Sequence, residues 1–185
     1  MAIEIIKKID FFALKNMQNS SKYLEELSSD ILNTLKQGNK IFLFGICAGG
    51  PLSISFKVFC RNGLIPEEYK EQIVGFMSGG DVAIIRAIER FEDYPLYGSN
   101  HLTELGFKDG DLLISMSEGG DTPIIIGATE AASKISSNKP YFIYCNPDEI
   151  LIKVVERSKN VILNPAIKKI SLYRSNGFKR LYKNA

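Results

Sequence analysis

Short apolar runs alternate along the chain with segments whose apolar residues recur every three or four positions. The runs occupy residues 40–46, 73–77, 112–116, 141–144 and 161–163. Continuous apolar runs of this length predict strands buried on both faces, and strands separated by helices pair in parallel through right-handed crossovers. The pattern therefore predicts an α/β fold, a single three-layer, doubly wound parallel sheet.

Helical periodicity places the connecting helices at residues 51–61, 81–91 and 122–135. An earlier helix, capped by Asn19 or Ser20 and ended by Gly38, has one apolar face made by Leu24, Leu27, Ile31 and Leu35. These helices supply the two outer layers of the predicted fold.

The region 93–110 is less regular and contains Pro95, Gly98 and Gly106, so we expect a surface excursion with a short helix near residues 101–105. The whole chain then divides into an N-terminal helical segment, the α/β domain and a basic C-terminal segment, at residues 1–38, 39–165 and 166–185.

Composition fits one globular domain, since 45% of the 185 residues are hydrophobic and 24% are charged. No apolar run approaches the roughly 18 residues that cross a bilayer, and the first ten residues lack the apolar core of a signal peptide. We expect a cytoplasmic protein without a membrane partner. Cys47, Cys60 and Cys145 have no C-x-x-C spacing, which argues against a disulfide framework or a metal site.

The charge is unevenly distributed. All 21 acidic residues lie at or before Glu156, whereas 8 of the 23 basic residues follow it. A basic tail can contact nucleic acid, but these charges are spread over 29 residues and include no run. We therefore expect no nucleic-acid partner. The tail either lies on the acidic body or folds over a pocket mouth.

Two glycine-rich turns follow predicted strands and lead into helices that begin near proline, at residues 45–51 and 117–123. Proline suits a helix start, where the free amides and the helix dipole attract anions. Such turns lie at the carboxyl ends of parallel strands, where ligands bind. The candidate ligand-binding residues are Gly45, Ala48, Gly49, Gly50, Ser117, Glu118, Gly119, Gly120, Asp121 and Thr122. Ordinary strand-to-helix turn chemistry explains the same glycines.

Nucleotide cofactors do not fit either turn. Cys47 occupies the place of the second glycine in G-x-G-x-x-G, no acidic residue follows at the required distance, and the Walker pattern is absent. We therefore expect no cofactor.

A combination of motifs resembles the N-acetylmuramic acid 6-phosphate etherases. These are sugar isomerase (SIS) domain proteins, and the glucokinase regulatory protein is a relative. The matching residues are Gly79-Gly80, residues 87–93, Asn100, Leu102, Asp111, Gly120-x-Thr122-Pro123 and Cys145-Asn146-Pro147. The likeness runs from about Lys40 to Pro147 and implies an SIS fold of the Rossmann-like or flavodoxin-like kind.

The resemblance implies that Glu92 is the catalytic base that removes a proton next to the aldehyde of a ring-opened sugar phosphate. A base of this kind needs a carboxylate that faces the ligand and is partly buried. Without the resemblance, Glu92 reads as part of a solvated acidic helix end.

Several positions depart from the etherase pattern. The family's first loop has Thr and Ser hydroxyls followed by Gly-Arg, and those positions are Ala48, Gly49, Gly50 and Pro51 here. In the second loop Gly119 replaces a serine and Asp121 an arginine. A carboxylate beside a phosphate repels it. The family's second catalytic carboxylate falls on Phe59, which cannot transfer a proton.

Other side chains have both a structural and a functional interpretation. Cys47 is a small buried thiol or a nucleophile, and His101 is a surface or helix-cap histidine or a ring-opening acid. Glu118 and Asp121 could join Glu92 in an acidic pocket suited to an amino sugar or a cation, and a loop carboxylate that caps the next helix explains Asp121 equally well.

The sequence thus favours an SIS domain that binds a sugar or sugar phosphate with reduced catalytic residues. An active sugar-phosphate lyase or aldose-ketose isomerase that uses Glu92 is one alternative. Etherases continue with further helices beyond the end of this likeness, so we expect a homodimer or pairing with another SIS subunit, and a structural partner of a split SIS protein is the other alternative.

Overall fold

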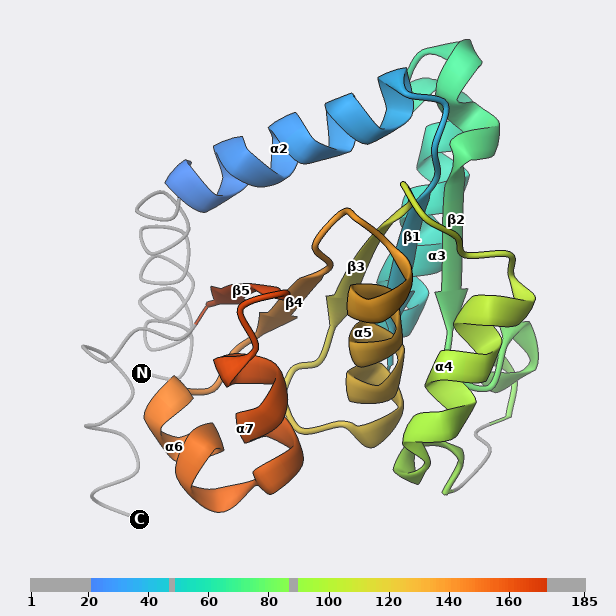
Figure 1. Cartoon of the computed structure of the whole chain (residues 1–185). Coiled ribbons are helices and arrows are strands. Elements are labelled where there is room, and N and C mark those ends of the chain that lie inside the picture. Colours follow the sequence, from blue (N-terminus) through green and yellow to red (C-terminus); the bar gives the residue numbers. More distant parts are fainter. Residues whose placement is uncertain (1–20, 47–48, 87–89, 173–185) are drawn as a thin grey trace, which may run out of the picture.

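The fold is built on a five-stranded, entirely parallel sheet with the strand order β2-β1-β3-β4-β5 (Figure 1). The computed structural model describes residues 21–46, 49–86 and 90–172. The strands are β1 (Ile41–Gly45), β2 (Ile73–Met77), β3 (Leu112–Met116), β4 (Tyr141–Tyr144) and β5 (Lys168–Ser171). The predicted doubly wound sheet is confirmed.

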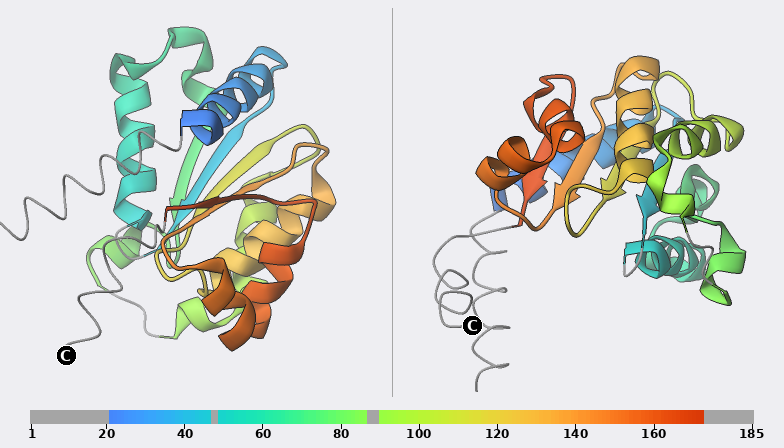
Figure 2. Two further views of the ribbon diagram at one scale, coloured as in Figure 1. Left: turned by 90° about the vertical axis from the view of Figure 1, so that its left-hand side faces the viewer. Right: turned by 90° about the horizontal axis from the view of Figure 1, so that it is seen from below.

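Helices cover both faces of the sheet and make the three layers (Figure 2). One face carries α2 (Ser21–Lys36) and α3 (Gly49–Phe59), together with a turn of π-helix at Cys60–Leu64 and a 3-10 helix at Glu67–Gln72. Leu35 of α2 packs there against the apolar side chains of alternate strand positions, Ile41 and Leu43 among them. The amphipathic helix before the first strand is confirmed, although Asn19 and Ser20 lie outside the described residues.

The opposite face carries α4 (Pro95–Glu104), α5 (Pro123–Ile135), α6 (Asp148–Val154) and α7 (Glu156–Leu163). The main core lies beneath these helices, where the intervening strand positions Phe42 and Phe44 meet residues of α4 and α5. Alternation within each apolar strand thus fills two cores. Within the described residues, no helix has both the length and the apolarity to cross a membrane.

The predicted strand at 161–163 is wrong, because these residues form the end of α7, where Val161 and Ile162 are buried against the core. The fifth strand is instead Lys168–Ser171, within the expected basic segment. Among the described strands it pairs with β4 alone, and Ile170 is its one buried residue, so it lacks the apolar run of an inner strand.

The continuous helix predicted at 81–91 is also wrong. Where the chain is described, it forms two separate 3-10 turns, η3 (Asp81–Ile84) and η4 (Phe91–Asp93). Arg90 between them has a left-handed φ of 65°, which no right-handed helix accommodates.

The surface excursion expected at 93–110 is wrong too, because this segment packs against the domain. Its helix α4 is longer than predicted and packs closely on α5, with Leu102 fully buried. Gly98 and Gly127 make this approach possible, because a Cβ at either would fall within 2.0 Å of a backbone carbonyl oxygen of the facing helix. Gly98 is therefore a packing residue and not a loop signal.

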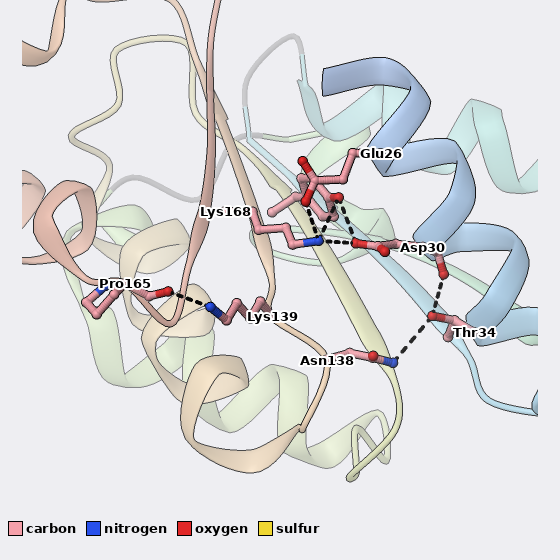
Figure 3. A network of polar contacts seen from close by, with 8 residues as sticks. Glu26, Asp30, Thr34, Asn138, Lys139, Pro165 and Lys168 are labelled. Carbon is pink, nitrogen blue, oxygen red and sulfur yellow. Dashed lines mark hydrogen bonds and ion pairs between the residues drawn. The ribbon is translucent and has the colours of Figure 1, made fainter. Parts of the chain in front are cut away.

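A polar network joins α2 to the last two strands at the amino-terminal edge of the sheet (Figure 3). Lys168 of β5 pairs with Asp30 and, at 2.7 Å, with Glu26. The buried Tyr141 donates its hydroxyl to Asp30 at 2.8 Å. The basic residue at 168 thus lies on an acidic helix of the body.

Candidate functional site

The two glycine-rich turns lie at the carboxyl edge of the sheet, one after β1 and one after β3. The strands are neighbours, but β1 leads into α3 on one face and β3 leads into α5 on the other (Figure 2). This reversal is the topological switch point at which open α/β sheets bind ligands.

The turn after β1 is shaped by close packing. A Cβ on Gly45 would lie 2.2 Å from the carbonyl oxygen of Gly49, and one on Gly50 would lie 2.9 Å from the terminal methyl of Met77. These glycines therefore have a steric reason that needs no ligand. Cys47 and Ala48 lie outside the described residues.

The turn after β3 is held by internal hydrogen bonds. The buried Ser117 hydroxyl accepts the amide hydrogen of Gly120 at 3.0 Å and lies 2.9 Å from the Thr122 hydroxyl oxygen. The two hydroxyls that the sequence suggested as ligand-binding groups thus bond to each other.

Four consecutive carbonyls of this turn bond to groups on the side of β4 and α7. The Glu118 carbonyl accepts the Cys145 amide at 3.0 Å, and the Gly119 carbonyl accepts the side-chain amide of Asn146 at 2.9 Å. From α7, the Ser158 hydroxyl donates to Gly120 at 2.8 Å and Arg157 Nε donates to Asp121 at 2.6 Å.

These bonds also orient the amides. In a trans peptide the N–H of each residue lies opposite the carbonyl of the residue before it. The amides of Gly119, Asp121 and Thr122 therefore point away from the groups that bond the preceding carbonyls. No residue in the described part of the chain accepts a hydrogen bond from these three amides. The Gly120 amide between them is bonded to Ser117, and the other three amides of the turn are available to bind an anion.

Gly120 is required by this arrangement. Its φ of +77° is left-handed, and a Cβ there would lie 2.7 Å from Leu151 of α6. Pro123 then begins α5, a helix of 13 residues whose dipole adds positive potential at the turn. The site thus joins the three oriented amides to the N-terminus of a full-length helix.

Glu92 lies apart from these hydrogen bonds. It is exposed on η4, a turn that contacts α5 and is anchored by Phe91, whose ring stacks on Tyr97 at 4.8 Å. The partial burial expected of a general base is not present in the single chain. Phe59, at the end of α3, is 59% exposed.

His101 is a half-buried residue of α4, with its ring 5.0 Å from that of Phe76 and 6.4 Å from that of Phe44. Burial lowers the pKa of His101, while Glu104 raises it. The structure places this histidine against the core, so the surface position expected from the sequence is wrong.

Acidic groups border the amide cluster. Glu118 is exposed and Asp121 half-buried. Burial raises the pKa of the neighbouring Cys145 thiol, and Glu118 adds to this rise. Among the described residues, no group of three His, Cys, Asp or Glu side chains could hold a metal ion.

Sequence reasoning missed three residues that shape the turn: Asn146, Arg157 and Ser158. Asn146 belongs to the Cys-Asn-Pro motif, which offered a signal without a role. Arg157 and Ser158 lie 36 and 38 residues from their partners, on a helix whose start the apolar pattern did not reveal.

The comparisons with known proteins agree with this architecture. The family model of the SIS domain matches residues 12–138. An N-acetylmuramic acid 6-phosphate etherase of Bacteroides fragilis is 32% identical over 132 residues, which cover 70% of this chain and 46% of that protein. The corresponding protein of Photorhabdus laumondii is 29% identical over 147 residues, 78% of this chain and 47% of the relative.

Solved structures show the same fold. A phosphoheptose isomerase from Neisseria gonorrhoeae superposes with a TM-score of 0.59 at 15% identity, over 100% of this chain and 92% of that one. One from Francisella tularensis gives 0.58 at 16% identity with the same coverage. The chain belongs to the SIS domain family and is related to the N-acetylmuramic acid 6-phosphate etherases. It spans about half the length of the curated relatives it matches.

Proposed function

We propose that this SIS domain binds a sugar phosphate at the switch point between β1 and β3, with the phosphate on the amides of Gly119, Asp121 and Thr122. The observation that supports the proposal is that the carbonyls of Glu118, Gly120 and Asp121 are bonded to other parts of the chain, which leaves these three amides without an acceptor among the described residues. The family relationship supports a phosphorylated sugar as the ligand class.

The mode of phosphate binding follows from the hydroxyl contacts. Ser117 and Thr122 are already bonded to each other, so backbone amides and the α5 dipole supply most of the attraction. Asp121 opposes it, because a carboxylate near a phosphate raises the electrostatic energy of the complex.

Binding is favoured over turnover by the surroundings of Glu92 and Phe59. Glu92 is exposed in the single chain, and Phe59 replaces the second carboxylate of the resembling etherases. The domain is thus proposed as an etherase relative with reduced catalytic residues, which acts in binding or regulation.

Thermal unfolding with a matched ligand panel tests the binding proposal. Glucosamine 6-phosphate, N-acetylglucosamine 6-phosphate, muramic acid phosphate, fructose 6-phosphate and inorganic phosphate are compared with the unphosphorylated sugars. A ligand at 100 times its Kd adds about 2.7 kcal/mol to the free energy of unfolding. Stabilisation by a phosphorylated sugar and not by its unphosphorylated form is expected. A flat response to every phosphorylated compound overturns the proposal.

Asp121→Asn sharpens this test. Removing the charge should tighten phosphate-sugar binding by about three- to tenfold and leave unphosphorylated sugars unchanged. Glu68→Gln is the matched control, because Glu68 is exposed on the 3-10 helix before β2, at the opposite edge of the sheet.

An enzymatic alternative has one observation in its favour, the contact of η4, which carries Glu92, with the helix of the phosphate turn. In this alternative the domain is a lyase or an aldose-ketose isomerase and Glu92 removes the proton. Lactate release from muramic acid phosphate, or interconversion of aldose and ketose phosphates, should then be lost in Glu92→Gln while binding persists. Activity that survives Glu92→Gln overturns this role.

Self-association is proposed from the exposed face of α3. Leu52, Phe56 and Phe59 follow one another at helical spacing and are 58%, 41% and 59% exposed. Lys57 is the one charged residue of α3, so two copies of this face can meet without strong like-charge repulsion. We propose a second copy of the chain as the occupant.

Light scattering after size exclusion tests this proposal. The chain should elute as a dimer, and Phe56→Glu should give a monomer. Val154→Glu is the control, because Val154 is 72% exposed on α6. A wild-type monomer at high micromolar concentration overturns self-association, and a stable pair with another SIS chain identifies the split-protein alternative.

A further inference from the structure

The N-terminal turn of α7 is bonded to the candidate phosphate turn from behind. Ser158 is fully buried, and its hydroxyl donates to the Gly120 carbonyl at 2.8 Å. Arg157, the preceding residue, reaches the Asp121 carbonyl with Nε at 2.6 Å. Two adjacent side chains of one helix thus hold two adjacent peptide groups of the turn.

Each bond determines the direction of one amide. Because carbonyl and amide are antiparallel within a trans peptide, Ser158 orients the N–H of Asp121 and Arg157 orients the N–H of Thr122. Gly120 allows either direction in isolation, since glycine adopts φ values of both signs. Without α7, the turn has no described partner for these two carbonyls and can rotate its peptides.

The remaining contacts of Gly120 hold the other side of the turn. Its own amide is held by Ser117, and a Cβ added at Gly120 would lie 2.7 Å from Leu151 and 3.1 Å from Tyr144. The turn is therefore fixed on the side of β3 and β4, and the two bonds from α7 fix the peptide groups that follow Gly120 and Asp121.

We infer that Ser158 and Arg157 are positioning residues for the anion site, which preorganise the amides of Asp121 and Thr122 without touching the ligand. The inference rests on the proposed function, since it concerns the same site. It assigns a binding role to a helix that carries no part of the recognised motifs. Preorganised donors bind an anion more tightly than donors that must first be ordered.

Amide-resolved NMR titration of the full chain with inorganic phosphate and with glucosamine 6-phosphate tests this role. In the wild type, the amides of Gly119, Asp121 and Thr122 should shift together with one Kd. Ser158→Ala should weaken the binding of both phosphate compounds about tenfold, because the misoriented Asp121 amide loses its charge-assisted hydrogen bond to the phosphate. The chemical-shift response of the Asp121 amide should then disappear. Arg157→Met should remove the response of Thr122, and Arg157→Lys should restore part of it.

Ser115→Ala is the matched control. Ser115 is equally buried and donates to a backbone carbonyl, that of Tyr141, at 2.9 Å, but its hydroxyl bonds to no group of the turn. Ser115→Ala should lose about as much stability as Ser158→Ala but keep the wild-type affinity for phosphate. This result would separate a positioning role of Ser158 from a role in folding alone.

The outcomes distinguish the two proposals. If wild-type amides respond and Ser158→Ala binds like Ser115→Ala, the positioning role is overturned and the proposed function stands. If no wild-type amide of the turn responds to either probe, the phosphate site itself is overturned and the role of α7 falls with it.

Discussion

Gly98 of α4 faces the Ile124 carbonyl of α5 so closely that a Cβ on Gly98 would lie 1.9 Å from that oxygen. The contact is reciprocal, because a Cβ on Gly127 would lie 2.0 Å from the Pro95 carbonyl oxygen. The two helices therefore touch through their backbones. This contact supports α5, the helix that begins at the candidate phosphate turn.

Gly98→Ala is expected to destabilise the domain by about 2–3 kcal/mol, because the added methyl must push α4 away from α5. The loss outweighs the gain of up to about 1 kcal/mol that alanine brings to a helix interior. Urea unfolding measures the difference.

Asn100→Ala provides the control on the same helix, since Asn100 is exposed. Its free energy of unfolding should stay within about 0.5 kcal/mol of the wild type. Equal stability of the two variants would contradict the close backbone contact.

The sheet could be predicted where strands are buried on both faces, as the runs that became β1 and β3 show. The apolar pattern failed at β5, where Lys168 and Lys169 are only partly buried on an edge strand. It also failed at α4, because glycine is a loop signal in a sequence but also permits backbone contact in a packed fold. Edge position and interhelix distance are tertiary facts, which local periodicity does not contain.

The position of the candidate site could be predicted, but its internal arrangement could not. Two glycine turns before helices place a site at the carboxyl edge of any parallel sheet. The partners of the Gly120 and Asp121 carbonyls come from α7, which lies far along the sequence. Nothing in the composition of a polar segment around Ser158 indicates which backbone group it will meet.

The pair formed by Asp30 and Lys168 should stabilise the attachment of α2 to the sheet (Figure 3). Burial by itself lowers the pKa of Lys168, but hydrogen bonds to Asp30 and Glu26 raise it above its ordinary value. A double-mutant cycle of Asp30→Asn and Lys168→Met should give a coupling free energy of about 1 kcal/mol.

Lys139→Met is the control for this cycle, because Lys139 donates to the Pro165 carbonyl at 3.0 Å and not to a carboxylate. Its effect should be small and additive with Asp30→Asn. A coupling indistinguishable from zero for Asp30 and Lys168 would show that the network does not hold α2.

Asp111 has a structural role that explains its place among the recognised motifs. Its side chain is fully buried and accepts the amides of Lys40 and Lys108 at 2.8 and 3.0 Å. Asp111→Ala leaves both amides without this acceptor and should cost about 2–4 kcal/mol in the free energy of unfolding.

Asp109→Ala is the comparison, because Asp109 is exposed and accepts the amide of Ser137 at 2.7 Å. Its loss should be clearly smaller in the same denaturation experiment. If Asp111→Ala also abolished phosphate-sugar binding without loss of stability, a direct ligand role would replace the structural one.

His101 should make the domain less stable in mild acid. Burial lowers the pKa of this imidazole below its ordinary value near 6.5, with a smaller opposing effect from Glu104. The unfolded chain therefore binds the proton more readily than the folded one, so this contribution to stability is complete above about pH 6.5 and is lost as the pH falls through the folded pKa. Because His101 is the single histidine of the sequence, its C2 proton gives one assignable NMR signal from which the folded pKa is read.

His101→Gln removes the titrating group, so the wild type should lose more stability than this variant between pH 7.5 and 5.5 in urea unfolding. Parallel stability curves for the two proteins, or an NMR midpoint above 6.5, would contradict the burial of His101 against Phe76.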